Sequence, residues 1–128
     1  MYDESLVVTG DWSATSGYLA FETLFRLTER PTAVFAQNDR MAVGLARAAR
    51  EAGVSIPEQL SLIGVDDMPL ASYFDPPLTT MRQDITSIGR EAVRLLTNSI
   101  ESKQECCQHL LLPVELVVRQ STASAPFA

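Results

Sequence analysis

Apolar runs rich in β-branched residues recur along this chain at a nearly constant interval, and this recurrence constrains the fold more than any other feature. The runs begin near residues 6, 33 and 60, about 27 residues apart, which is close to the roughly 30 residues of a strand–helix–strand unit. Each run is almost continuously hydrophobic, as parallel strands covered on both faces should be. We therefore predict an α/β fold with an open, mainly parallel sheet flanked by helices.

Segments with helical periodicity separate and follow these runs. The first predicted helix ends before Pro31, the second begins at the capping pair Asn38-Asp39 and ends at Gly53, and the third is capped by Asp84. A fourth extended segment precedes Asp84, and a pair of strands is expected near the C-terminus. The predicted helices cover 14–28, 39–52 and 85–100, and the further strands cover 78–82, 110–112 and 114–118.

Length and charge restrict the class of protein. At 128 residues the chain has the size of one domain, and its net charge of -6 with no cluster of Lys or Arg argues against direct contact with DNA by these residues. No stretch approaches the roughly 20 apolar residues of a membrane span, and the N-terminus lacks the pattern of a signal peptide. Cys106 and Cys107 are adjacent, which disfavours a disulfide between them and fits the reducing cytoplasm.

Polar side chains follow each predicted strand. In an open parallel sheet the carboxyl ends of the strands share one edge, and ligands bind in the crevice outside that edge. Carboxylates and amides there can each engage two hydroxyl groups, and an indole can cover the apolar face of a sugar ring. This inventory favours a neutral polyhydroxylated ligand over an anion. The residues are Asp11-Trp12-Ser13, Gln37-Asn38-Asp39, Asp66-Asp67 and Gln83-Asp84.

Each of these residues also has a simpler interpretation. Helix capping alone explains Asn38, Asp39 and Asp84, core or interface packing explains Trp12, and a solvated turn explains the Asp66-Asp67 pair. Paired carboxylates also occur in glycoside hydrolases, but no feature here selects an acid and a base. The single His109, near the two cysteines, matches no zinc-binding spacing and no serine–histidine arrangement. We predict no catalytic residues, no metal and no cofactor.

Five stretches, taken in order and spacing, resemble the LacI/GalR family of transcription regulators between about residues 5 and 122. Any one of them would be a weak signal, whereas the ordered set is specific. They are the segment from Phe35 to Gly44, Val54 to Pro57, Ser61 to Asp67, Pro77 to Gln83 and Leu112 to Ser121.

The resemblance implies roles for particular residues. In this family an aromatic residue stacks on the effector and polar residues at the strand ends hydrogen-bond it, which assigns ligand contact to Trp12, Asn38, Asp66 and Gln83. The implied effector is a sugar, with a galactoside as one candidate. The resemblance also assigns a dimer interface, formed by Val43, Tyr73 and Phe74.

The same resemblance implies a division of the chain. Residues 1–122 would be part of an effector-binding domain of the type I periplasmic-binding-protein-like architecture, 84–112 would belong to its N-terminal subdomain, and 123–128 would be a frayed tail. The implied protein is not an enzyme but a cytoplasmic homodimer without membrane contact, which binds operator DNA only through an N-terminal headpiece outside this sequence. The alternative is a periplasmic sugar-binding protein of a transporter, which shares the architecture.

Overall fold

The computed structural model of the protein describes residues 3–102 and 109–125, and its centre is a four-stranded sheet in the order β1-β2-β3-β4. The first three strands are parallel and β4 is antiparallel to β3. The predicted open, mainly parallel sheet flanked by helices is therefore confirmed. The strands are β1 (Ala33–Phe35), β2 (Ser61–Asp66), β3 (Thr79–Gln83) and β4 (Val114–Val117).

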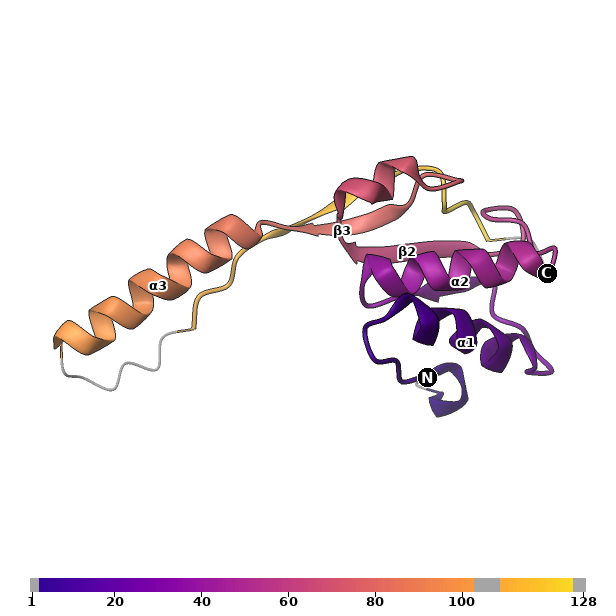
Figure 1. Cartoon of the computed structure of the whole chain (residues 1–128), viewed down its shortest axis with the longest axis horizontal. Coiled ribbons are helices and arrows are strands. Elements are labelled where there is room, and N and C mark those ends of the chain that lie inside the picture. The colour runs from indigo at the N-terminus through magenta and orange to yellow at the C-terminus, as the bar shows by residue number, and fades with distance from the viewer. Residues whose placement is uncertain (1–2, 103–108, 126–128) are drawn as a thin grey trace.

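Two helices, α1 (Ala14–Phe25) and α2 (Asp39–Glu51), lie together along one side of the sheet (Figure 1). They approach each other closely because glycines stand at the crossing. A Cβ atom on Gly44 would lie 1.7 Å from the carbonyl oxygen of Ala14, and one on Gly17 would lie 2.1 Å from that of Met41. The main core lies between these helices and the sheet, and it includes Phe21, Ala42, Leu45, Ala49, Leu60, Leu62 and Leu78.

The predicted helix starts are confirmed at atomic level. Ser13 caps α1 by accepting a hydrogen bond from the backbone N–H of Ser16, and Asn38 caps α2 by accepting from that of Met41. Asp84 accepts from the N–H of Ser87 at the start of α3 (Ile85–Ser102). Each cap satisfies a backbone donor that the first turn of a helix leaves free, which is why these residue types mark the starts.

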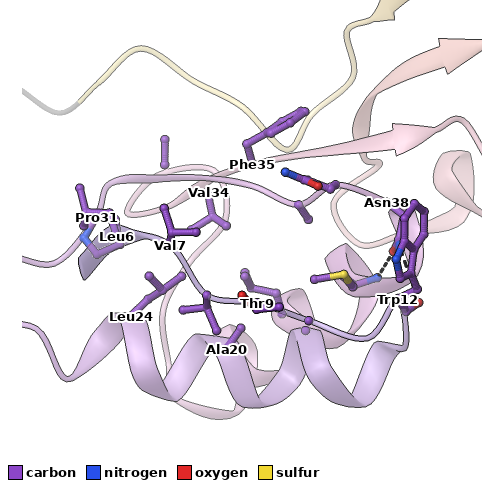
Figure 2. A pocket seen from close by; sticks show the side chains of 18 residues that line it. Leu6, Val7, Thr9, Trp12, Ala20, Leu24, Pro31, Val34, Phe35 and Asn38 are labelled. Carbon is purple, nitrogen blue, oxygen red and sulfur yellow. Dashed lines mark hydrogen bonds between the residues drawn. The ribbon is translucent and has the colours of Figure 1, made fainter. Parts of the chain in front are cut away.

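The strand predicted near residues 6–8 is wrong. Residues Glu4–Leu6 form a short 3-10 helix, η1, and the chain from Val7 to Gly10 contributes no strand to the sheet. A cavity of about 570 Å³ separates this segment from β1 (Figure 2). The segment is apolar and β-branched, but a strand requires a hydrogen-bonding neighbour, and the cavity leaves it none.

Helix α3 projects away from the sheet and the other helices (Figure 1). Many of the apolar side chains along it are exposed, including those of Val93, Leu96 and Ile100. The predicted strand at 110–112 is also wrong, because the chain that returns from α3 joins the sheet only at Val114. The assignment of 84–112 to a separate subdomain stays a prediction.

The chain after β4 returns to the sheet. Ser121 is buried, and its hydroxyl accepts from the N–H of Thr79 at 2.7 Å and donates to the carbonyl of Leu62 at 2.6 Å. Beyond it, the N–H of Ala123 donates to the Ser61 hydroxyl at 3.1 Å. Ala123 is thus hydrogen-bonded to the start of β2. The frayed tail at 123–128 stays a prediction, and residues 126–128 lie outside the described residues.

In the described part of the chain, no helix is both long and apolar enough to cross a membrane. Within those same residues, no group of three or more His, Cys, Asp or Glu side chains is arranged to hold a metal ion. Cys106 and Cys107, on which the disulfide argument rests, lie outside the described residues.

Candidate functional site

Three of the four predicted ligand residues stand at the carboxyl ends of strands. Asn38 follows β1, while Asp66 and Gln83 are the last residues of β2 and β3. Trp12 lies in the loop that precedes α1. Because β1, β2 and β3 are parallel, their carboxyl ends lie on one edge of the sheet. We call these four residues the rim.

Trp12 and Asn38 form the first contact of the rim. The Asn38 side-chain amide lies 3.5 Å from the carbonyl oxygen of Trp12, and both residues line the same end of the cavity beside β1 (Figure 2). Their exposure differs sharply, because the Trp12 side chain is 68% exposed whereas Asn38 is 2% exposed. Trp12 has a φ of 70°, in the left-handed region, and its indole is open to solvent next to a fixed amide.

A hydrogen-bonded turn before α1 holds Trp12. The Asp11 carboxylate accepts hydrogen bonds from the hydroxyl and the N–H of Ser13. The hydrogen bond from the Ser13 hydroxyl, followed by one from Ser16, lowers the pKa of Asp11 to about 2. The carboxylate is therefore ionised at neutral pH, and it fixes the backbone on both sides of the indole.

Asp66 and Gln83 form the second contact. The Gln83 amide donates to a carboxylate oxygen of Asp66 at 3.2 Å, which joins the tips of β2 and β3. Asp66 is half-buried and has a φ of 110°. Its second carboxylate oxygen has no partner among the hydrogen bonds of the described residues. The pair thus presents an acceptor and an amide at one place on the rim.

Asp67 serves the fold of the rim and is not the solvated turn residue that the sequence indicates. It is 9% exposed at its side chain, and it accepts hydrogen bonds from Arg119 at 2.6 Å and from Arg82 at 2.7 Å. Burial raises the pKa of Asp67, but the two arginines outweigh burial and lower it overall. Sequence reasoning missed both arginines, since each stands far along the chain from Asp67 and follows no local pattern.

Asp39 is not the cap that its position predicts, because Asn38 performs that role. Its side chain is fully buried and accepts from the Thr80 hydroxyl at 2.6 Å and from the N–H of Met68 at 2.7 Å. Burial raises the pKa of Asp39, and the negative charges of Asp66 and Asp67 raise it further. The two rim contacts are not hydrogen-bonded to each other within the described residues. Asp39 follows Asn38 of the first contact and is hydrogen-bonded to β3 and to the segment after β2.

The cavity beside β1 touches the rim only at Trp12 and Asn38. It runs from these residues to Leu6 and Pro31, between the segment 6–10 and β1, and its lining is mainly apolar (Figure 2). Asp66 and Gln83 do not line it. Its chemistry suits apolar side chains better than a polyhydroxylated ligand.

The residues assigned to a dimer interface differ in exposure. Tyr73 is 84% exposed, at the end of the short helix η2 (Pro69–Tyr73), and Val43 is exposed on α2. Phe74 is half-buried and packs against the core. Two of the three are therefore available on the surface, and the third also has the core role that its residue type predicts.

Comparison with known proteins gives one family match and several close relatives. The profile of the periplasmic binding protein-like domain matches residues 2–122. The chain is 41% identical over 124 residues to the HTH-type transcriptional repressor PurR of Klebsiella pneumoniae, and the alignment covers 97% of this chain and 36% of PurR. The chain therefore spans about a third of that relative.

Two solved regulators share the fold. The complex of the transcriptional regulator CelR with cellobiose superposes with a TM-score of 0.85 at 37% identity, covering 94% of this chain and 37% of CelR. The lac repressor dimer bound to operator and the anti-inducer ONPF superposes with a TM-score of 0.81 at 37% identity, covering 90% of this chain and 40% of the repressor. The similarity extends over nearly all of this chain.

Proposed function

Since this chain belongs to the periplasmic binding protein-like domain family, we propose that it is the ligand-sensing part of a DNA-binding transcription regulator and that its effector is a sugar. The similar proteins support a regulator, because PurR is a transcriptional repressor and the solved neighbours are a regulator with cellobiose and a repressor with operator. These relatives are not enzymes, and we propose no reaction for this chain.

The observation that carries the sugar assignment is the composition of the rim. Trp12 offers an exposed aromatic face beside the buried Asn38 amide. Asp66 and Gln83 offer a carboxylate and an amide at the ends of the next two strands of the sheet. An aromatic face binds the C–H surface of a sugar, and bidentate polar groups bind its hydroxyls. The rim has no arginine of its own to favour an anion.

Regulation follows if the sugar binds one conformation better than another. A ligand with equal affinity for two conformations does not shift the equilibrium between them. The rim must therefore contact the sugar more completely in one of the two conformations. A coupling free energy on the order of 1–3 kcal/mol is typical of such switches. We propose that the sugar induces release from the operator.

The DNA contact belongs to another part of the protein in this proposal. The chain carries a net charge of -6, which repels the phosphate backbone. We propose that the regulator is a homodimer through Val43, Tyr73 and Phe74, a surface distinct from the rim. The lac repressor, which this chain resembles, is a dimer on its operator.

The test is calorimetric titration of the protein with cellobiose, ribose, lactose, methyl β-galactoside and, as a ligand of another class, a purine base. We expect one sugar to bind, and Trp12→Ala to weaken its affinity at least about tenfold, because the exposed aromatic face on which the sugar would stack is lost. Leu19→Ala, which removes an exposed apolar side chain of α1, is the matched control and should bind as the wild type does. Binding of the purine alone would refute the sugar assignment.

A second measurement separates the regulator from a transporter component. The complete protein should retard DNA from upstream of its own operon, and the sugar that binds should release it. A periplasmic binding protein would bind the sugar and leave the DNA mobility unchanged. A panel of chromogenic glycosides should show no hydrolysis in the same preparation.

A further inference from the structure

Asp39 is the most completely buried charged residue of the described chain, and no cation pairs with it there. Its side chain has no solvent exposure, and none of the ion pairs among the described residues includes it. Burying a carboxylate without a counter-ion is costly unless hydrogen bonds satisfy it. A charged group in such a place requires an explanation beyond packing.

The two oxygens of Asp39 bind two different segments of the chain. Oδ1 accepts from the hydroxyl of Thr80 in β3, and Oδ2 accepts from the backbone N–H of Met68 in the segment after β2. Thr80 is three residues before Gln83, and Met68 is two residues after Asp66. One carboxylate thus connects the start of α2 to both strands that carry the second rim contact.

The neighbour on the other side of Asp39 belongs to the first rim contact. Asn38 immediately precedes it, caps α2 and lies against the Trp12 carbonyl. Since Asn38 already caps the helix, the Asp39 side chain is free to turn toward the sheet. The position of the carboxylate therefore fixes Asn38 relative to Asp66 and Gln83.

The centre of β2 leaves space for this arrangement. A Cβ atom on Gly64 would lie 2.2 Å from Oδ1 of Asp39, far inside contact distance. Glycine at the middle of a buried strand weakens the strand, and its usual reason is the close approach of another group. Here that group is the Asp39 carboxylate, which occupies the space that a side chain at 64 would fill.

We infer that Asp39 is a positioning residue, which touches no ligand but holds Asn38, Asp66 and Gln83 in one arrangement through its hydrogen bonds to Thr80 and Met68. The inference rests on the proposed function for its ligand. The structural part of the inference is that a single carboxylate couples the start of α2 to β3 and to the segment after β2. That coupling is measurable without any sugar.

Hydrogen exchange tests the coupling directly. In Asp39→Ala, the Met68 amide should lose about tenfold or more of its protection relative to the amides of β2, since it loses its acceptor. Asp39→Asn should restore part of the protection, because an amide oxygen can accept from Met68. Thr80→Val should loosen β3 against α2, and Thr80→Ser should behave as the wild type does.

The matched control is Leu60→Ala. Leu60 is fully buried at the opposite end of β2, so its loss destabilises the fold without touching Asp39. If Leu60→Ala lowers Met68 protection, relative to β2, as much as Asp39→Ala does, the effect is general destabilisation and the inference is overturned. If Asp39→Ala does not fold, the comparison of Thr80→Val with Thr80→Ser decides the same question.

Affinity for the sugar found in the panel gives the functional readout. We expect about a tenfold loss in Asp39→Ala or Thr80→Val and less than about a threefold change in Thr80→Ser and Leu60→Ala. Unchanged affinity in the first two variants would overturn the positioning role. If no sugar binds the wild type, the proposed function fails, and the exchange of Met68 still decides whether Asp39 couples α2 to β3 and to the segment after β2.

Discussion

The side-chain amide of Gln83 donates to Oδ1 of Asp66 across 3.2 Å, and this hydrogen bond joins the last residues of two parallel strands. Two residues predicted separately from strand-end positions thus contact each other. The contact orients both side chains before any ligand arrives, which lowers the entropy lost on binding.

Gln83→Glu should therefore destabilise the protein as well as weaken ligand binding. The new carboxylate would face Asp66, and like charges at such a distance repel by about 1 kcal/mol or more in a partly solvated site. Urea denaturation at neutral pH measures the loss. Gln120→Glu makes the same charge change at an exposed position and should alter stability by less than about 0.5 kcal/mol. Equal effects in the two variants would contradict the prediction.

Arg119→Ala should be far more damaging than the loss of a surface arginine. Arg119 donates to Asp67 and also to the carbonyl of Leu78, so its removal leaves a nearly buried carboxylate short of a partner. We expect a loss of about 2–3 kcal/mol in the free energy of unfolding. Arg26→Ala breaks an exposed ion pair with Glu22 and should cost less than about 1 kcal/mol. Comparable losses of stability in the two variants would contradict the prediction that the Asp67–Arg119 ion pair stabilises the fold more than an exposed ion pair does.

Two glycine-to-alanine changes should act in opposite directions. Gly44→Ala places a methyl group against the backbone of α1, where neither helix can yield easily, and should cost about 3 kcal/mol. Gly89→Ala meets nothing within 4 Å on the exposed helix α3 and should stabilise by about 0.5–1 kcal/mol. Thermal unfolding of both variants measures the contrast. A stabilising Gly44→Ala would mean that α1 and α2 do not pack closely.

The stability of Asp39→Asn relative to the wild type should rise with pH. Burial raises the folded-state pKa of Asp39 above its unfolded value. As the pH rises, Asp39 therefore loses its proton in the unfolded chain before it does so in the folded protein. The contribution of Asp39 to the wild type's stability is fully present below about pH 3.9 and is lost as the pH rises through the folded-state pKa. Asparagine does not titrate. Asp66 and Asp67 face the site and remain in both proteins, so the difference between the two unfolding free energies isolates Asp39.

Urea denaturation from about pH 3.5 to pH 7 checks this slope. A difference that stays flat over the range would place the folded pKa at its ordinary value. Asp67 should show the opposite sign, because its arginine partners lower its folded pKa. Its contribution is present above the ordinary pKa and is lost as the pH falls.

Tyr73→Ser should weaken self-association. The side chain is large, aromatic and 84% exposed, and tyrosine is enriched among residues that dominate interfaces. Sedimentation velocity should give a dimer dissociation constant raised by about tenfold or more. Leu19→Ser, on the exposed face of α1, should leave the constant unchanged. A dimer that resists Tyr73→Ser would have to form through another surface.

The sequence predicted those parts of the fold that local patterns determine. The parallel strands and the caps at Ser13, Asn38 and Asp84 all follow from residue type and spacing over a few positions. The same logic failed for residues 6–8, because a strand also requires a neighbour that its own sequence does not encode. It failed again at 110–112, where the returning chain is not yet beside β3.

The site divides in the same way. The strand-end positions of Asn38, Asp66 and Gln83 were predictable from the topology, whereas Trp12 follows no strand. The partners of Asp39 and Asp67 were not, since Thr80 stands 41 residues from Asp39 and Arg119 stands 52 residues from Asp67. Helix capping is the best local explanation for an aspartate at 39, and only the packed structure shows that its neighbour performs that role.

Trp12, Asp66 and Asp67 are all held at positive φ, where residues with a Cβ atom are strained. Backbone strain of this kind costs on the order of 1 kcal/mol per residue or more, and the surrounding contacts must sustain it. Variants selected only for thermal tolerance should accumulate glycine at these three positions, gaining melting temperature while sensing fails. In this protein, robustness and responsiveness therefore compete at the same backbone torsions.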